Sequence, residues 1–274
     1  MIRLVSSRRV LRQPLRPLLN LGCGQHRHPD WTNADLEPAG SDVIPCDLRQ
    51  PLPFTAESFT AVYAAHVLEH LWPVEAHRLL GEMHRVLRPG GTVRIVVPDL
   101  EGIARSYLAS LEQAAAKPSA EHRWEHRWMT VELLDQLVRG RSGGMMRRWW
   151  SCDPVPCREF IESRLGQEAA AGMAAVAADR QARGVEPPGP EEILSAEPPN
   201  SREANRFEGR GERHRWMYDR LSLAERLSEA GFVDIRQTGP LASNIPDFAA
   251  AQLDADQVGR PRKPDSLYLE GVRP

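Results

Sequence analysis

The stretch LNLGCGQHRHPDW (residues 19–31) begins as a short apolar strand and runs into a turn that carries Gly22 and Gly24. Glycines let a backbone approach a ligand closely, because no β-carbon is in the way. Gln25 stands where a dinucleotide-binding turn would have its third glycine. Only the seven residues 25–31 separate this turn from the next strand-like run, TNADLE. A crossover with its own helix usually needs about 10–12 residues, so we expect the chain to return to the sheet without a helix.

The composition indicates a soluble protein with no dominant charge. The 274 residues include 35 basic and 37 acidic side chains, so no global field favours nucleic acid or an anionic membrane. Four cysteines fit a reducing compartment. No run approaches the ~20 apolar residues of a membrane span, and the basic segment 1–16 lacks the apolar core of a secretory signal. We therefore expect a cytoplasmic protein that does not bind membranes.

An alternation of strands and helices follows the first strand. The runs LLNLG, TNADL, DVIPC, FTAVYAA and TVRIVVP are predicted to be strands, and the last two are apolar on both faces. PVEAHRLLGEMHRVLRPGG (73–91) has an apolar stripe at helical spacing, a proline in its first turn and Pro-Gly-Gly at its end. This order predicts an α/β protein with a mostly parallel sheet and helices on both faces.

The alternation stops after residue 100 and returns near residue 216. Segments 101–117, 121–139 and 158–183 are predicted to be helices, and RSGGMMRRWW a loop. Residues 184–200, with five prolines and four glutamates, are predicted to be a mobile acidic linker. A helix at 222–232 and two strands, VDIRQTG and SLYLEGV, close the chain. We expect a core of residues 17–100 and 216–274, with residues 101–215 forming a mostly helical insertion that caps a substrate site.

Several motifs in this order resemble a known family. LNLGCG ends the first strand, and the chain then contains PDWTNAD (29–35), CDLRQPLPF (46–54), AAHVLEHL (64–71), LGEMHRVLRPGG (80–91), VVPDLEG (96–102) and SLYLEGVRP (266–274). Together they resemble the class I S-adenosylmethionine-dependent methyltransferases, and within them a trimmed bacterial subgroup of the methyltransferase-domain-11 type. The resemblance covers about residues 17–108 and 213–274, and it implies a Rossmann-like sheet with S-adenosylmethionine as cofactor.

The resemblance also implies where the cofactor binds. In open α/β sheets, ligands lie beyond the carboxyl ends of the strands. Gly22 and Gly24 would flank the methionine part, and Asp35 would accept both ribose hydroxyls. Asp47 and Leu48 would face the adenine, while Asn20 stands where many relatives carry an acid. The expected cofactor contacts are Asn20, Gly22, Cys23, Gly24, Asp35, Leu36, Asp47, Leu48, Ala65 and His66.

The short return to the second strand bears on the choice of cofactor. Asp35 follows Gly22 by 13 positions, whereas the dinucleotide fingerprint spaces its acid about 20 residues on. The missing helix would have offered N–H groups to a pyrophosphate. A cofactor with one small carboxylate tolerates that loss, above all if His26, Arg27 or His28 supplies a positive charge. The spacing therefore disfavours NAD more than S-adenosylmethionine.

Methyl transfer depends mainly on the alignment of acceptor, carbon and sulfur. A hydroxyl acceptor would also use a base near neutrality, for which His66 is the first candidate and His26 and His28 are alternatives. An amine or carboxylate acceptor would need none. The acceptor is expected to be a small molecule or a saccharide or natural-product intermediate of bacterial biosynthesis, methylated on oxygen or nitrogen.

Other histidine, tryptophan and cysteine patterns have simpler structural interpretations. His66 and His70 share a helical face but lack a third spaced ligand, so no metal site is predicted. EHRWEHRWM (121–129) is read as a helix with an aromatic edge in a core, with a pocket wall as the alternative. The Arg/Trp mixture of residues 145–150 and 213–220 suggests a cap over the acceptor more than an RNA surface. Cys152 and Cys157 have no matching pair for zinc.

The predicted function is therefore an S-adenosylmethionine-dependent methyltransferase. The alternatives are a non-catalytic methyltransferase-fold module that binds a partner through the Arg/Trp insert, and an RNA methyltransferase. The sequence leaves the oligomeric state open.

Overall fold

A seven-stranded sheet forms one half of the molecule. The computed structural model describes residues 16–195, 200–208 and 211–274. The strands lie in the order β3-β2-β1-β4-β5-β7-β6. Strands β1 to β5 are parallel to their neighbours, while β7 is antiparallel to both β5 and β6. This confirms the predicted Rossmann-like, mostly parallel α/β sheet. The bounds are β1 (Leu18–Leu21), β2 (Trp31–Asp35), β3 (Val43–Pro45), β4 (Phe59–Ala65), β5 (Leu87–Pro98), β6 (Val233–Gln237) and β7 (Ser266–Val272).

The chain returns from β1 to β2 without a helix, as predicted. Gly22 (φ +66°) and Gly24 (φ +49°) both adopt the left-handed backbone conformation that favours glycine. The amide N–H of Gly22 donates to the carbonyl of Ala34, at 2.8 Å, which holds the turn against the end of β2. A β-carbon on Gly22 would lie only 2.4 Å from Cγ2 of Val67, so this position has no room for a side chain.

Two helices, α1 (Pro73–Val86) and α8 (Arg220–Glu229), cover one face of the sheet. The apolar stripe of α1 is fully buried there, as its spacing predicted. The helix ends at Val86, before the Pro89-Gly90-Gly91 that was predicted to stop it. Leu87 instead begins β5 and pairs with Phe59 of β4, because burying both side chains in the sheet outweighs another helical turn.

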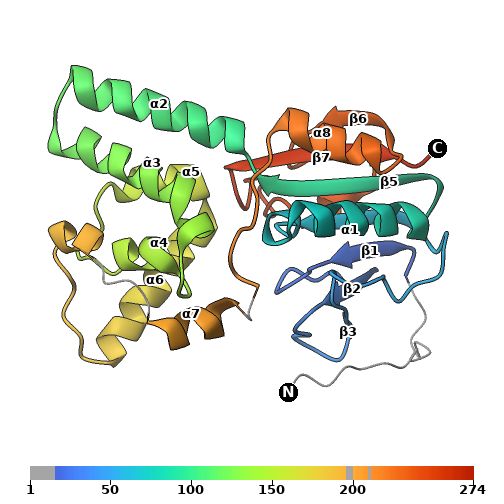
Figure 1. Ribbon diagram of the computed structural model, residues 1–274, viewed down its shortest axis with the longest axis horizontal. Helices are drawn as coiled ribbons and strands as arrows, with labels where there is room; N and C mark the ends of the chain where they lie inside the picture. Colours follow the sequence, from blue (N-terminus) through green and yellow to red (C-terminus); the bar gives the residue numbers. More distant parts are fainter. Residues whose placement is uncertain (1–15, 196–199, 209–210) are drawn as a thin grey trace.

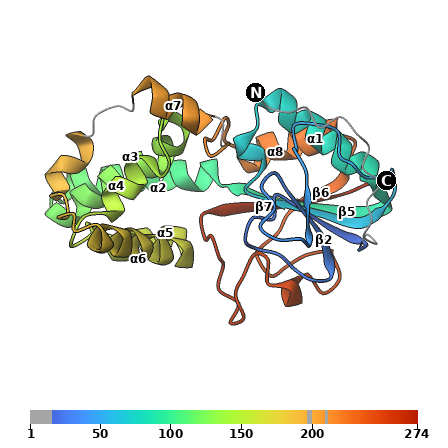
Figure 2. The same ribbon diagram turned by 90° about the horizontal axis from the view of Figure 1, so that it is seen from below.

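A segment with little regular structure covers the opposite face. Figure 2 shows α1 and α8 on one side of the sheet and the segment around the 3-10 helix η3 (Phe248–Ala251) on the other. Trp31 packs edge-on against Tyr63 and against Phe248, in each case with ring centroids 6.1 Å apart, and Tyr63 lies tilted against Phe248 at 5.5 Å. The shortened crossover leaves these aromatic side chains without a helix above them, and the C-terminal segment fills that place.

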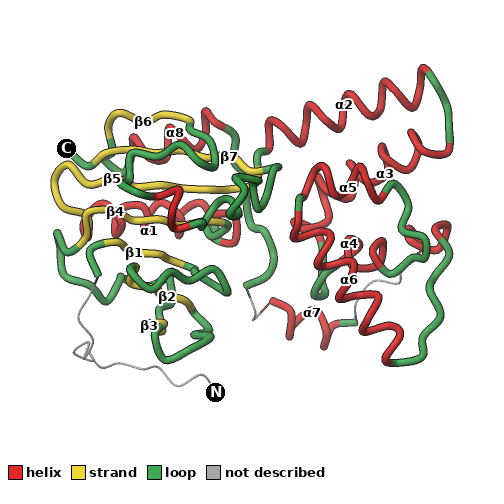
Figure 3. The backbone as a smooth tube through the Cα atoms, turned by 180° about the vertical axis from the view of Figure 1, so that it is seen from behind, coloured by secondary structure: helices red, strands yellow, loops and turns green. Residues whose placement is uncertain are grey.

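The remaining helices form the other half of the molecule, beyond the carboxyl ends of the central strands (Figures 1 and 3). They pack around a second hydrophobic cluster of their own. Their bounds are α2 (Leu100–Ala116), α3 (Ala120–Val138), α4 (Gly144–Trp150), α5 (Arg158–Leu165), α6 (Gln167–Ala182), η2 (Pro190–Ser195) and α7 (Ser201–Glu208). A further 3-10 helix, η1 (Leu68–His70), follows β4.

Three predictions for this half need correction. Residues 144–150 form α4, not a loop, because the carboxylate of Asp135 accepts hydrogen bonds from the amides of Met145 and Met146 at the start of that helix. The predicted helix 158–183 is two helices that meet at Gly166 (φ +70°). The predicted linker 184–200 contains η2, while residues 196–199, like residues 1–15 of the basic N-terminal segment, lie outside the described residues.

The tryptophans of the helical half are mainly core residues, as predicted for 121–129. Trp128 and Trp149 are fully buried with ring centroids 5.5 Å apart. Trp124 packs edge-on against Trp149 at 5.6 Å. His122 and His126 instead contact residues of α2 and of the α2–α3 turn. The repeat therefore joins two helices and builds a core.

Candidate functional site

The glycine turn and Asp35 lie together at the carboxyl ends of β1 and β2. The Asp35 carboxylate accepts hydrogen bonds from the amides of Gly24, at 2.8 Å, and Glu37, at 3.0 Å. It is half-buried, so solvent or a ligand can still reach it. The two features that the sequence singled out are thus in direct contact.

Asp47 and Leu48 lie beyond the neighbouring strand, β3. Arg49 donates from Nε and Nη2 to the two oxygens of Asp47, at 2.8 and 3.0 Å. Burial raises the pKa of Asp47, but the hydrogen bonds and charge of Arg49 outweigh it and lower that pKa. Leu48 packs against the core, with Cδ1 3.9 Å from the place of a β-carbon on Gly22. Leu36 is half-exposed.

Asn20 is buried and takes part in holding the turn. Its amide nitrogen donates to the carbonyl of His26, at 2.9 Å, and to Oδ1 of Asn33, at 3.1 Å. Asn20 therefore stabilises the path of the chain, a role that the sequence did not suggest. It also borders the smaller cavity described below.

The three basic residues after the turn have different positions. His26 borders the smaller cavity, with Nε2 3.6 Å from the Glu168 carboxylate. Arg27 instead pairs with Asp42 at 2.7 Å. The ring Nδ1 of His28 accepts from the Asp30 amide, and His28 borders neither of the two cavities at the strand ends. Of these three, only His26 is positioned to bring positive charge to the cavity.

His66 follows directly after β4 and has a positive φ of 52°. Its amide donates to the carbonyl of Val96, which fixes the backbone at the end of the sheet. Nδ1 lies 3.0 Å from Oε1 of Glu69, and Nε2 lies 3.1 Å from the hydroxyl of Ser266. Both ring nitrogens therefore have polar neighbours.

Two cavities meet at these strand ends. The smaller, of about 70 Å³, lies against the glycine turn, and the larger, of about 370 Å³, lies between the sheet and the helical half. His66, Glu168 and Lys263 border both. The smaller cavity is also lined by Asn20, Gly22, Cys23, His26, Tyr63, Ala65, Val96, Leu253, Asp254, Arg262, Ser266 and Tyr268.

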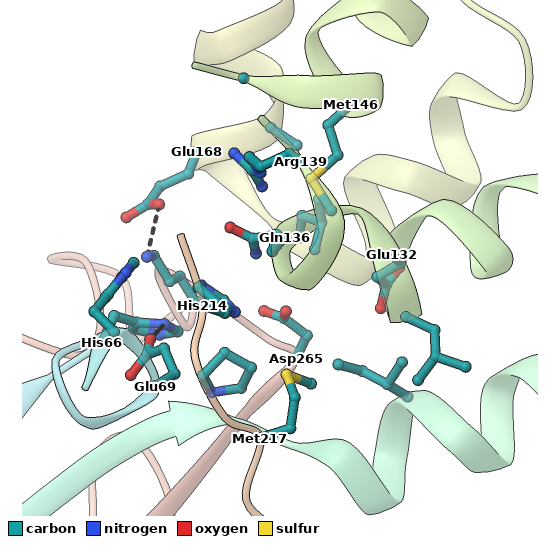
Figure 4. A pocket seen from close by; sticks show the side chains of 18 of the residues that line it. His66, Glu69, Glu132, Gln136, Arg139, Met146, Glu168, His214, Met217 and Asp265 are labelled. Carbon is teal, nitrogen blue, oxygen red and sulfur yellow. Dashed lines mark ion pairs between the residues drawn. The ribbon is translucent and has the colours of Figure 1, made fainter. Parts of the chain in front are cut away.

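The larger cavity is lined by polar and apolar side chains in about equal measure. Figure 4 shows His66, Glu69 and His214 grouped on one side of it, with Gln136, Arg139 and Met146 of the helical half on the other. Its other walls include His70, Glu132, Trp150, Glu168, Met217, Lys263 and Asp265. Many of these residues lie in the stretch 101–215 that was predicted to cap a substrate site, but His66 is the one among them that the sequence analysis named as a site residue.

Glu168, at the start of α6, connects the helical half to the glycine turn. Its carboxylate lies 3.6 Å from Nε2 of His26 and 3.3 Å from Nζ of Lys263. Burial raises the pKa of Glu168, but the contacts with His26 and Lys263 outweigh it and hold that pKa at about 2. Glu168 therefore stays ionised near neutral pH.

Glu69, His70 and His214 form a cluster on the wall of the larger cavity. One ligand atom from each lies within 4.8 Å of the others. Burial raises the pKa of Glu69, but His66, His70 and His214 outweigh it and lower that pKa to about 2. Burial, the largest influence, lowers the pKa of His214 to about 3. The sequence set aside a metal at His66 and His70 for want of a third ligand, and the fold brings His214 to that place.

Comparison with known proteins finds one family match, which lies in the sheet half. Residues 27–95, about a quarter of the chain, match the family model of a methyltransferase domain. A comparison with curated proteins finds no match. Among the described residues, no helix is long and apolar enough to cross a membrane.

Several solved structures are similar over part or most of the chain. A S-adenosylmethionine-dependent methyltransferase from Thermotoga maritima is 10% identical over 96% of this chain and 84% of its own, with a TM-score of 0.41. One chain of a Haloferax volcanii complex that contains the Trm112 methyltransferase activator is 13% identical over 96% of this chain and 86% of its own, with a TM-score of 0.38.

A Burkholderia thailandensis 1,6-didemethyltoxoflavin-N1-methyltransferase, with S-adenosylhomocysteine bound, is 24% identical over 30% of this chain and 44% of its own, with a TM-score of 0.26. These likenesses are too distant to carry an activity, a substrate or a partner to this chain. The chain thus combines a Rossmann-like, mostly parallel sheet with a methyltransferase-domain match that is confined to residues 27–95.

Proposed function

We propose that the protein transfers the methyl group of S-adenosylmethionine to a small polar acceptor. The observation that carries this proposal is the meeting of two cavities at His66, one against the glycine turn and one large enough for a small molecule. A methyl donor in the first and an acceptor in the second would meet beside that residue.

The residues at the strand ends fit the cofactor. Gly24 has no atom within 4 Å of where a β-carbon would stand, which leaves the outer side of the turn open for a ligand. A carboxylate has about four acceptor sites, so Asp35 can accept ribose hydroxyls while it holds the amides of Gly24 and Glu37. Asp47 likewise keeps acceptor capacity beside Arg49 for an adenine amino group, and Leu48 offers an apolar wall.

The methionine end of the cofactor would lie at the turn itself. His26 and Lys263 bring positive charge to the smaller cavity, where the methionine carboxylate is expected. Glu168 pairs with both of these side chains. Its carboxylate would therefore have to share them with the cofactor or move aside when the cofactor binds.

The character of the larger cavity favours a small acceptor with hydroxyl or amine groups. Carboxylates from Glu69, Glu132 and Asp265 face it together with Gln136. In the Arg/Trp segments 145–150 and 213–220, Trp149 is fully buried and Trp150 borders the larger cavity, whereas Trp216 is 49% exposed. We propose that residues 101–215 act as the acceptor cap over the core of residues 17–100 and 216–274.

The chain's own contribution to the reaction is alignment and proton removal. When bound, S-adenosylmethionine supplies a methyl group on a positively charged sulfur that leaves as a neutral thioether. Holding the acceptor in line is then the main requirement. In the tautomer with its proton on Nδ1, which faces the Glu69 carboxylate at 3.0 Å, His66 would offer Nε2 as the base for a hydroxyl acceptor. The Ser266 hydroxyl beside Nε2 can rotate away to admit it.

Calorimetry tests the proposal. The protein is titrated with S-adenosylmethionine and with S-adenosylhomocysteine, its demethylated product, and we expect one site per chain. Asp35→Ala is expected to weaken binding on the order of tenfold or more, since a charge-assisted hydrogen bond contributes about 1.5–3 kcal/mol. Glu112→Ala, which removes an exposed carboxylate of α2, serves as control and should bind normally.

Two results would count against the proposal. Absence of heat with either ligand would favour a non-catalytic module instead. Unchanged affinity in Asp35→Ala would show that the ribose assignment is wrong.

A further inference from the structure

None of Glu69, His70 and His214 is among the expected cofactor contacts, although Glu69 lies 3.0 Å from Nδ1 of His66, which is. Glu69 and His70 belong to η1, and His214 comes from the segment between α7 and α8. All three border the larger cavity. Backbone hydrogen bonds hold the two segments together, since the amides of Arg215 and Trp216 both donate to the carbonyl of Glu69, at 2.6 and 3.2 Å.

Unpartnered polar atoms are the first sign of a ligand here. Glu69 is fully buried, and neither carboxylate oxygen has a hydrogen-bond partner within the described part of the chain. His66 Nδ1 approaches one of them to 3.0 Å as an ion pair without hydrogen-bond alignment. His214, 4% exposed, also has an Nδ1 without a hydrogen-bond partner among those residues. Leaving a charged group buried in this way is costly.

The two imidazoles are poised as ligands. Nδ1 of His70 lies 3.3 Å from the carbonyl of Arg213, so it donates its proton there and leaves the lone pair on Nε2. Metal-ligating histidines commonly make this contact with a backbone carbonyl.

We propose that Glu69, His70 and His214 bind one divalent transition-metal ion, of which zinc is the prime candidate. Two imidazoles and one carboxylate form a recurrent three-ligand set that leaves a coordination position free. In tetrahedral coordination, ligand atoms about 2.0–2.1 Å from a zinc ion lie about 3.3 Å from one another. The present spread of up to 4.8 Å therefore requires the side chains to close by about 1.5 Å when the ion binds.

His66 would support this site from outside. It approaches Glu69 through Nδ1 and would orient that carboxylate, as outer-shell partners of metal ligands do. Because all three ligands border the larger cavity, the free position of the ion would face a molecule bound there. An ion in that position can hold and polarise an oxygen of such a molecule.

Metal titration tests the proposal without reference to methyl transfer. Untagged protein, first treated with a chelator, is titrated with Zn²⁺ by calorimetry and with Co²⁺ by visible absorption. We expect one ion per chain. His70→Gln and His214→Gln should each weaken binding on the order of 100-fold or more, since loss of an outer-shell partner alone typically costs 10–100-fold. His122→Gln, which removes a histidine of α3 outside the cavity, is the matched control and should bind normally.

Spectra of the wild-type protein test the proposed site even if the variants misfold. X-ray absorption of the zinc-loaded protein should show nitrogen and oxygen ligands at about 2.0–2.2 Å, including two imidazoles. Thiolate charge-transfer bands with Co²⁺, absence of 1:1 binding, or equal loss in His122→Gln would overturn the proposal. Because S-adenosylhomocysteine binding is measured separately on the metal-free protein, failure of one proposal is distinguishable from failure of the other.

Discussion

At the scale of single residues, the two glycines of the first turn are required for different reasons. Both have a positive φ, which other residues adopt only with strain. Gly22 is also pressed against Val67, whereas the surroundings of Gly24 are open. Gly22 thus serves the packing of the turn, and Gly24 leaves space on its outer side.

This difference predicts unequal costs for alanine. Gly24→Ala should lower the free energy of unfolding by about 1–2 kcal/mol, from backbone strain alone. Gly22→Ala adds a clash with Val67 and should lose a further 1–3 kcal/mol or so. Urea unfolding of the two variants and the wild type measures both. Equal losses would contradict the packing assigned to Gly22.

At the scale of elements, one arginine attaches the irregular C-terminal segment to the sheet. Arg94 of β5 is fully buried and pairs with Asp254, at 2.7 Å, and Glu270, at 2.9 Å. It also donates to the carbonyls of Gly239 and Ala242. The guanidinium therefore takes over, on this face, part of the role that a covering helix has on the other.

Arg94→Met should leave two buried carboxylates without their cation. Removing one partner of a buried ion pair typically costs about 3–5 kcal/mol, and we expect a loss of unfolding free energy in that range. Arg236→Met is the matched control, because Arg236 pairs with the same Glu270 from an exposed position, at 3.6 Å. Exposed pairs contribute about 0–1 kcal/mol. Chemical denaturation that gave similar losses for both variants would refute this role of Arg94.

The elements that were predicted correctly have local signals. The strands of the sheet and α1 follow from apolar runs and helical spacing. The start of α4 was missed because its cap is Asp135, which lies in the preceding helix. The break at Gly166 was missed because its cause is distant, since a β-carbon there would meet the carbonyl of Arg262 at 2.9 Å. An alanine-rich sequence shows none of these contacts.

At the scale of the whole molecule, the candidate site likewise has one part that could be predicted from the sequence and one part that could not. The side chains at the strand ends could be named from the sequence, because parallel strands end at one edge. The larger cavity could not, since its walls come from both halves of the chain. Glu69 and His214 are more than 140 residues apart, and Glu168 reaches the glycine turn from α6. Only tertiary packing brings such residues together.

The central claim is that a cofactor binds across the glycine turn, with Asp35 on its sugar. A crystal structure of the protein with S-adenosylhomocysteine tests this most directly. The account predicts both ribose hydroxyls within hydrogen-bond distance of the Asp35 carboxylate, the adenine between Asp47 and Leu48, and the sulfur beside His66. Two results would contradict this binding mode. Glu168, His26 and Lys263 would still fill the crevice at saturating ligand, or the ligand would bind elsewhere on the protein.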